Sequence, residues 1–293
     1  MGWFKKWFFI IRPFTLAASI SPVAVGICAA SLLGKFNGWH AAAVMVCAMA
    51  LQVLSNLVND YCDFRRGADG PERLGPARAV SQGVITPRQL LTAISVDAAV
   101  CIVLGGYLIW LGGWPVIAIG VTAMLFAVLY SATRHSLASL GIADLFSLSY
   151  YGFIASMGTT YILTGQWNML SFWLGLGCGA LATGILTVNN TRDYKGDNAS
   201  DKRTLVVKVG RRHGDAAALQ FGRGYYAVCL FSVSLIAALV MKSWPAACIL
   251  FILAVFLYRK FLKAEGRGYN RILMLTGFYD LAYAVSVILW SIL

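Results

Sequence analysis

The feature that most constrains this chain is a succession of apolar segments, each about 20 residues long, separated by short polar links. A segment of that length can cross the hydrocarbon core of a bilayer as a helix, which satisfies its own backbone hydrogen bonds. Composition agrees with this interpretation. Charged residues make up 12% of the chain, about half the share found in soluble domains. The predicted fold class is therefore an all-α, polytopic membrane protein.

Nine segments are predicted to cross the membrane within a single transmembrane domain over residues 1–293. Their approximate limits are 14–33, 39–61, 89–111, 114–133, 141–163, 168–190, 215–241, 244–262 and 271–292. The links alternate in character: those after the first, third, fifth and seventh segments are tight, and those after the second, sixth and eighth are longer and polar. The N-terminal run resembles a signal peptide, but it continues to Leu33, so we expect an uncleaved first helix.

The distribution of positive charge predicts which side of the membrane each link faces. Of the 24 Lys and Arg residues, only Lys35 and Lys242 lie in the tight links. Cytoplasmic loops carry an excess of Lys and Arg, so the N-terminus and the longer links are expected in the cytoplasm, as in the plasma (inner) membrane of a bacterium. The net charge of +12 comes from basic residues in short segments between apolar spans, and no soluble module presents a basic face. We therefore expect lipid headgroups and an anionic substrate, and no nucleic acid, as partners.

A first polar motif closes the second apolar segment, where Asn56, Asn59, Asp60 and Asp63 follow one another at helical spacing. Residues four apart lie on the same side of a helix, so these four groups are expected to share roughly one face. Carboxylates at the end of an apolar helix are costly unless they are paired. The motif continues through a glycine-rich turn with further charged residues: Asp69, Arg73 and Arg78.

A second motif of the same kind closes the sixth segment, with Asn189, Asp193 and Asp197. The two motifs, at 56–69 and 189–201, lie four segments apart, which fits an internal four-helix duplication with a ninth helix added. Oxygen ligands of this kind suit Mg²⁺, which commonly bridges protein carboxylates and substrate phosphates. Nearby cations are expected to hold phosphate oxygens directly. They are Arg73, Arg78, Arg192, Lys202 and Arg203.

Together, these groups favour a site that stabilises a departing diphosphate, whose developing charge is the main barrier to ionising an allylic ester. The apolar bundle behind the motifs is expected to hold a long isoprenoid tail. Aromatic side chains there can stabilise an allylic cation. The candidates are Tyr61, Tyr130, Tyr150 and Tyr151.

The two motifs, NLVNDYCDFRRGADG and NNTRDYKGDNASDKRTL, resemble the paired aspartate motifs of the UbiA superfamily of intramembrane prenyltransferases. The segment GPERLGPARAVSQGVIT is similar to its MenA-type, 1,4-dihydroxy-2-naphthoate branch, as are RPFTL and LGIADLFSLSYYG. The resemblance covers nearly the whole chain. It departs at YSATRHSLASLG, where the branch often has a stretch rich in glycine and proline.

The resemblance implies nine helices around a central cavity, with Mg²⁺ and a polyprenyl diphosphate at the cytosolic mouth. It implies a prenyl transfer to 1,4-dihydroxy-2-naphthoate in which CO₂ and diphosphate leave and demethylmenaquinone, a step of menaquinone biosynthesis, is made. By motif match, the metal ligands or their supports are Asn59, Asp63, Asp69, Asn189, Asp193 and Asp197. Asn56 and Asn190 are expected to contact substrate, and the catalytic group is completed by Asp60, Asp144 and Tyr130.

Several alternatives stay open at this point. The acceptor could be another aromatic ring, such as 4-hydroxybenzoate. A cation-coupled secondary transporter is a rival of a different class, although transporters usually place their sites near the membrane midplane. Asp97 and Asp280 lie deep in apolar segments and could be functional or could pair for packing. The prenyl chain length, the general base and the oligomeric state are not determined by these residues.

Overall fold

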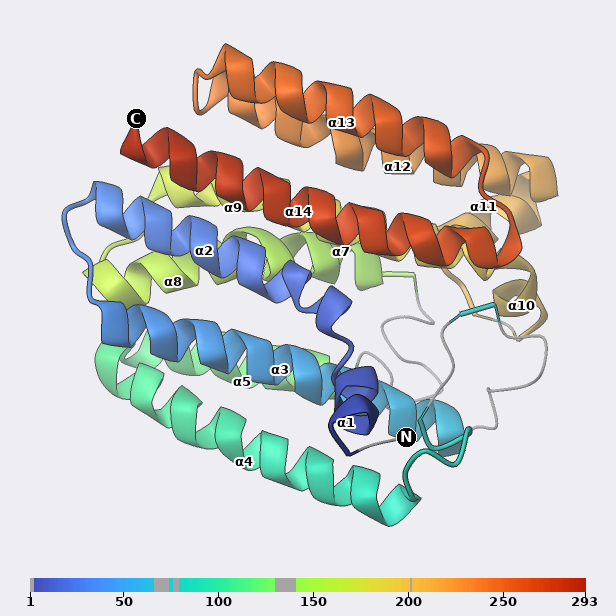
Figure 1. Cartoon of the computed structure of the whole chain (residues 1–293), viewed down its shortest axis with the longest axis horizontal. Coiled ribbons are helices and arrows are strands. Elements are labelled where there is room, and N and C mark those ends of the chain that lie inside the picture. The colour runs from blue at the N-terminus through green and yellow to red at the C-terminus, as the bar shows by residue number, and fades with distance from the viewer. Residues whose placement is uncertain (1–2, 66–73, 76–78, 130–140, 201) are drawn as a thin grey trace.

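The structure, a computed structural model, describes residues 3–65, 74–75, 79–129, 141–200 and 202–293. These residues form helices and connecting turns and contain no strand. The long helices run side by side along the longest axis of the molecule (Figure 1). The first half consists of α1 (Trp3–Ile11), η1 (Pro13–Thr15), α2 (Ala17–Leu32), α3 (Gly38–Arg65), α4 (Pro87–Gly112), α5 (Trp114–Leu129), α7 (Ala143–Leu148), η2 (Ser149–Ile154) and α8 (Ala155–Thr164). The second half consists of α9 (Met169–Arg192), α10 (Tyr194–Ala199), α11 (Leu205–His213), α12 (Asp215–Leu239), α13 (Trp244–Leu262), η3 (Gly266–Gly268) and α14 (Tyr269–Ile292).

Six of the described helices are long and apolar enough to cross a membrane. A seventh is obtained if Lys6–Thr15 and Ala17–Leu32, which meet at 53°, are taken as one bent span. The all-α membrane fold is therefore confirmed, whereas the count of nine stays a prediction. The difference arises because α5 is described only as a 16-residue helix and the fifth segment is divided among α7, η2 and α8.

Local sequence explains where several helices begin. α4 starts with a capping box, in which the Thr86 hydroxyl accepts a hydrogen bond from the Gln89 amide while the Gln89 side chain accepts one from the Thr86 amide. Pro87 occupies the first turn of α4, where its missing N–H costs nothing. α9 is capped by Asn168. These caps lie at helix ends, where unpaired backbone N–H groups need a partner.

A close approach between η2 and α9 brings the fifth segment against the middle of the bundle. η2 is a π-helical turn with an irregular backbone at Gly152 (φ −116°, ψ −115°). A Cβ atom on Gly152 would lie 2.9 Å from the Cα of Gly179, so only glycine fits on either side. π-Helical turns inside helices frequently occur at functional sites. This turn carries Tyr150 and Tyr151 into the site described below.

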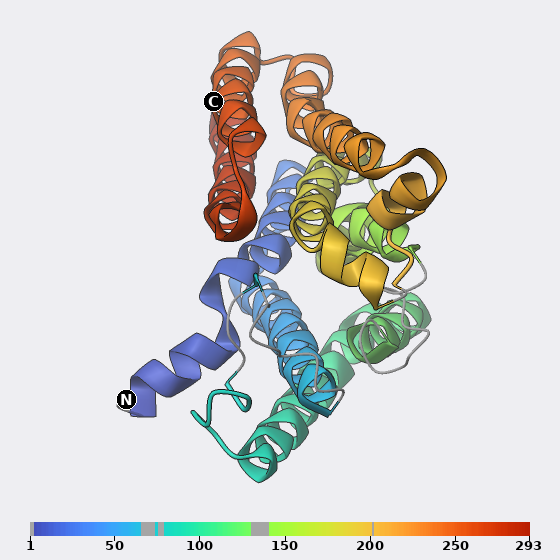
Figure 2. The same cartoon turned by 90° about the vertical axis from the view of Figure 1, so that its right-hand side faces the viewer.

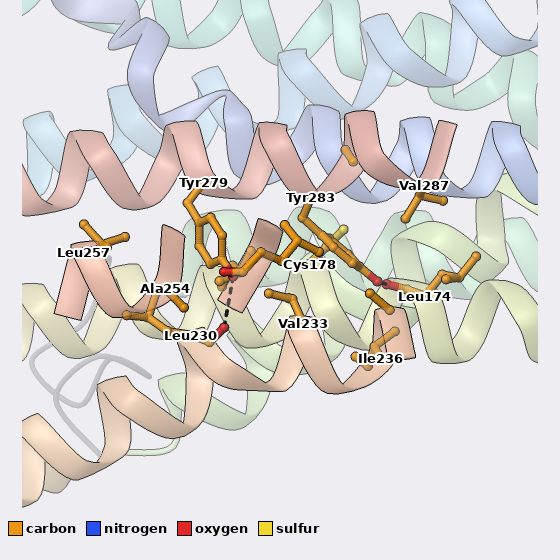
Figure 3. Close-up of a cluster of buried hydrophobic side chains, with 14 of the residues drawn as sticks. Leu174, Cys178, Leu230, Val233, Ile236, Ala254, Leu257, Tyr279, Tyr283 and Val287 are labelled. Carbon is orange, nitrogen blue, oxygen red and sulfur yellow. Dashed lines mark hydrogen bonds between the residues drawn. The ribbon is translucent and has the colours of Figure 1, made fainter. Parts of the chain in front are cut away.

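The largest hydrophobic core lies between α9, α12, α13 and α14 (Figure 3). Two tyrosines of α14 cross it and satisfy their hydroxyl groups on backbone carbonyls. Tyr279 donates to the carbonyls of Leu250 at 2.9 Å and Leu230 at 3.3 Å, and Tyr283 donates to that of Leu174 at 2.8 Å. A buried hydroxyl without a partner would be costly, so these bonds fix how α14 packs against its neighbours.

The two ends of the bundle differ in character. The short helices α10 and α11 lie at the end where α3 and α9 finish, and the C-terminus lies at the opposite end (Figure 1). Figure 2 is viewed onto the end with α10 and α11 and shows the long helices standing around the middle of the molecule. Both polar motifs therefore meet at one end of the bundle.

Candidate active site

A cavity of about 1020 Å³ occupies the middle of the bundle and is walled mainly by apolar side chains. Residues of eleven elements line it: α1, η1, α2, α3, α4, α5, α7, η2, α8, α9 and α14. One end lies among Leu108, Val116 and Ile162. It is near two tight links that are joined by a hydrogen bond from the Lys35 ammonium to the Thr164 carbonyl. The other end reaches the two polar motifs through Asn59 and Asn189. Its volume is at the upper end of the range for small-molecule sites.

A single face of α3 forms much of the cavity wall. The lining residues recur every three or four positions from Val44 to Asn59, as a helix face requires. With a rise of about 1.5 Å per residue, these 15 steps cover roughly 22 Å along the bundle axis. The wall is apolar at its start and polar at its end. A ligand that follows α3 would therefore need a long apolar part and a polar head.

The four groups of the first motif lie on roughly one face of α3, as expected, and divide into two pairs by their contacts. Asn56 and Asp60 are buried and turn toward the N-terminal segment. The Asn56 amide donates to the hydroxyl of Thr15 at 2.8 Å and to the carbonyl of Ile11 at 3.1 Å. Asp60 forms an ion pair with Arg12. Asn56 also lines the cavity, whereas Asp60 does not, so their contacts make them anchors of the N-terminal segment.

The second pair of that motif consists of Asn59 and Asp63. Asn59 lines the cavity directly, and Asp63 follows it one helical turn later, half-buried near the end of α3. The further predicted residues of this region lie outside the described residues. They are Asp69, Arg73, Arg78 and Tyr130.

The second motif is held by a network around the buried side chain of Arg192. Its Nε and Nη2 donate to the two carboxylate oxygens of Asp193 at 2.8 and 2.6 Å, which is a bidentate arrangement. Its Nη1 donates to Oδ1 of Asn270 at 2.6 Å. In this state Arg192 holds a predicted metal ligand, in addition to its expected role toward phosphate. Of the neighbouring amides, Asn189 lines the cavity, and Asn190 is buried beside it without lining it.

Asp197 lies one turn beyond Asp193, and its amide donates to the Asp193 carbonyl at 2.8 Å. Burial raises the pKa of the Asp197 carboxyl, the ammonium of Lys202 at 3.0 Å lowers it, and the nearby Asp193 carboxylate raises it. Two acids in this position favour a bound cation. Lys202 forms an ion pair with Asp197. Arg203 is exposed and does not line the cavity.

Other predicted residues lie elsewhere. Asp144 is buried in the first turn of α7 near Tyr225 and Lys208, and is not a lining residue. Tyr61 packs in a cluster with Ile10 and Leu57, so the expectation that it lines the cavity is wrong. Tyr150 and Tyr151 do line it. Asp97 and Asp280, left open above, are not among its lining residues either.

The described residues supply some, but not all, of the oxygen ligands that a hard divalent cation needs. No three His, Cys, Asp or Glu side chains converge anywhere in the described ranges. The second motif nevertheless places two carboxylates of the same helical run close enough to interact, one of them buried. Mg²⁺ usually binds through one or two carboxylates, retained waters and substrate phosphates. Asp193 and Asp197, with the amide oxygen of Asn189, supply that donor set.

Two site residues were not predicted from the sequence. One is Arg12, which lines the cavity and pairs with Asp60. Asn270 lies at the start of α14, 78 residues from Arg192, and lines the cavity mouth. The RPFTL segment was a signal for Arg12. No local pattern pointed to Asn270, because its partners come from distant segments.

These observations define a helical membrane protein whose apolar cavity ends in two acid-bearing motifs. The model of the UbiA prenyltransferase family matches residues 19–279, so the chain belongs to that family. Among curated relatives, it is 32% identical to the 1,4-dihydroxy-2-naphthoate octaprenyltransferase of Escherichia coli (strain K12) over 70% of this chain and 69% of that one. It is 33% identical to the protein of the same name from Mycobacterium tuberculosis (strain ATCC 25618 / H37Rv), over 78% and 76% respectively.

Solved structures agree in fold. A UbiA homolog from Archaeoglobus fulgidus bound to GPP and Mg²⁺ superimposes with a TM-score of 0.63 at 14% identity, over 97% of this chain and 99% of that one. The apo structure of a UbiA homolog from Aeropyrum pernix K1 gives a TM-score of 0.66 at 13% identity, over 92% and 97%. The protein is therefore a multi-pass membrane protein with the UbiA-type fold.

Proposed function

We propose that this protein transfers a polyprenyl group from polyprenyl diphosphate to 1,4-dihydroxy-2-naphthoate, a step of menaquinone biosynthesis. The observation that carries the proposal is a cavity that joins a long apolar wall to both polar motifs. A prenyl tail and its charged head need such a combination. The names of the curated relatives support the choice of acceptor.

The reaction divides between the two parts of the site. The bond between C1 of the prenyl chain and the diphosphate oxygen breaks, and the diphosphate leaves with the electron pair. The electron-rich ring carbon that carries the carboxylate forms a new bond to C1, and the carboxylate then leaves as CO₂. The product is the dihydroxy form of demethylmenaquinone. Tyr150 and Tyr151 lie on the cavity wall, where aromatic faces favour a developing allylic cation.

Magnesium dependence is part of the proposal. Bound Mg²⁺ would supply positive charge to the leaving diphosphate. Asp193 and Asp197, together with Asn59, Asp63 and Asn189, are the residues proposed to hold it. The position of Asp197 supports this role, because its buried carboxyl lies one turn beyond Asp193. Arg192 makes a bidentate contact with one of these acids, Asp193.

We also propose that the mouth faces the cytoplasm of a bacterial cell, with the protein in the inner membrane. Lys and Arg concentrate at the end that carries α10 and α11, including Arg211 and Arg212. The opposite end has the isolated Lys35 and Lys242. Anionic cytoplasmic leaflets favour that orientation. Labelling from one side of the membrane tests it, as described in the Discussion.

The proposal is tested with purified protein, the naphthoate, a polyprenyl diphosphate and Mg²⁺. We expect prenylated product, and we expect Asp63→Asn and Asp193→Asn each to reduce kcat by at least about 100-fold, which corresponds to about 2.7 kcal/mol of transition-state stabilisation. Asp215→Asn is the control, because Asp215 lies at the same end of the molecule and bonds to Tyr194. Full turnover by both motif variants would overturn the metal assignment.

A further inference from the structure

Asn270 joins two parts of the cavity mouth that are far apart in the sequence. Its Oδ1 accepts a hydrogen bond from Nη1 of Arg192 at 2.6 Å. Its Nδ2 donates to the carbonyl of Leu74 at 2.9 Å. Leu74 belongs to the link that follows the first motif, and Arg192 belongs to the second motif. One amide side chain from a third element, α14, therefore connects the two.

We propose that Asn270 is a positioning residue that orients the Arg192 guanidinium toward the diphosphate. The inference rests on the proposed function of the same mouth. All three guanidinium nitrogens of Arg192 have a hydrogen-bond partner: two bond to Asp193 and one to Asn270. The side chain of Arg192 is only 5% exposed, so an unsatisfied N–H there would be costly. Asn270 therefore fixes the plane of the guanidinium.

The chemistry of an amide explains why asparagine suits this position. One neighbour is a cation that only donates, and the other is a carbonyl that only accepts. Aspartate could satisfy Arg192 but not Leu74, and it would add a negative charge beside the expected diphosphate. Lysine could satisfy Leu74 but would repel Arg192. Only a side chain that both donates and accepts completes the connection.

The position of Asn270 ties this network to the cavity. It is one of three cavity-lining residues from α14, with Leu273 and Met274, and it is the polar one. α14 itself is fixed in the bundle by the buried hydroxyls of Tyr279 and Tyr283. Asn270 thus links Arg192 to a helix that is fixed in the bundle, in addition to the link that contains Leu74. A precisely held charge contributes more to leaving-group stabilisation than a flexible one.

The test measures binding of Mg²⁺ with inorganic diphosphate by thermal stabilisation, without any acceptor. We expect Asn270→Ala to raise the diphosphate concentration for half-maximal stabilisation about tenfold. In turnover assays it should raise the KM for prenyl diphosphate by a similar factor and change the KM for the aromatic acceptor by less than twofold. Asn270→Gln, which keeps both functions on a longer side chain, should recover part of the loss.

A second arm separates positioning from a purely structural role. In an Arg192→Gln background, Asn270→Ala should change diphosphate binding by less than twofold, because its target has been removed. Asn37→Ala is the control for general destabilisation, since Asn37 caps α3 at the opposite end of the molecule. A tenfold effect of Asn270→Ala in both backgrounds, or equal losses in Asn270→Ala and Asn37→Ala, would overturn the proposal.

The outcomes also distinguish this inference from the proposed function. If the wild-type protein binds magnesium diphosphate but does not prenylate the naphthoate, the acceptor is wrong and the role of Asn270 is still measured. If the protein binds magnesium diphosphate equally well with and without Asn270→Ala, the positioning role is wrong and the proposed reaction stands. Absence of any diphosphate binding by the wild-type protein would contradict both.

Discussion

Arg12 lines the cavity and pairs with Asp60, which lies 48 positions later in the sequence. Arg12 has a positive φ of 55°, which is uncommon for a residue with a side chain. Its carbonyl accepts hydrogen bonds from the amide and hydroxyl of Thr15, so the chain turns into η1 at this point. Asp60 therefore anchors the N-terminal segment through its ion pair with Arg12. The neighbouring Asn59 remains directed into the cavity.

This contact predicts energetic coupling between the two residues. In a double-mutant cycle of Arg12→Ala and Asp60→Asn, we expect a coupling free energy of about 2 kcal/mol, since buried neighbours in one network couple by about 0.5–3 kcal/mol. The free energy of unfolding in mixed detergent micelles provides the measurement. Additive effects of the two substitutions would show that the ion pair contributes nothing to stability.

Some roles of single residues could be predicted and others could not. The amide and carboxylate groups of the two motifs stood out because polar residues are costly at the end of an apolar helix, as Asn59 and Asp193 show. The ion pair of Asp60 could not be predicted, because Arg12 reaches it from a distant segment. Asn270 was missed for the same reason: its partners, Leu74 and Arg192, come from distant segments.

At the scale of elements, the contact between η2 and α9 fixes the wall that carries the cavity tyrosines. Gly152 and Gly179 face each other so closely that a Cβ on Gly179 would lie 2.9 Å from the Cα of Gly152. Sequence periodicity predicted a continuous fifth segment here. The structure replaces it by α7, the π-turn η2 and α8, because the backbone must bend around this contact.

Gly179→Ala should therefore destabilise the protein by more than about 2 kcal/mol, because backbone atoms cannot move aside as a flexible side chain can. The matched control is Gly224→Ala in α12. A Cβ at Gly224 meets no atom within 4 Å, so alanine should stabilise that exposed helix position by up to about 1 kcal/mol. Thermal unfolding of the two purified variants compares them. Equal melting temperatures would contradict the close packing of η2 on α9.

At the scale of the whole molecule, the fold was predictable because apolar length and charge distribution act along the chain and do not depend on tertiary detail. The structure confirms the all-helical membrane fold and brings both motifs to one end. The shape of the cavity could not be predicted from the sequence. Its walls come from eleven elements, and only their packing decides that Arg12, Tyr150 and Asn270 face the same space.

The proposed orientation predicts which sites are reachable from each side of the membrane. Cysteines introduced by Lys35→Cys and Lys242→Cys should react with an impermeant thiol reagent added outside intact cells. A cysteine introduced by Arg212→Cys should react only after the membrane is opened. The parent protein is the control for its exposed native thiol, Cys248. The reverse labelling pattern would place the motifs outside and contradict a cytosolic mouth.

The central claim is most directly tested by the mass of the lipid product formed when the purified protein is offered 1,4-dihydroxy-2-naphthoate and 4-hydroxybenzoate together, with a polyprenyl diphosphate and Mg²⁺. We predict a prenylated naphthalenediol, or its quinone after oxidation, that has lost the carboxylate as CO₂. We also predict that the product is absent when Asp193→Asn replaces the wild-type protein. A prenylated 4-hydroxybenzoate as the main product, or a prenylated naphthoate that keeps its carboxylate, would contradict the proposal.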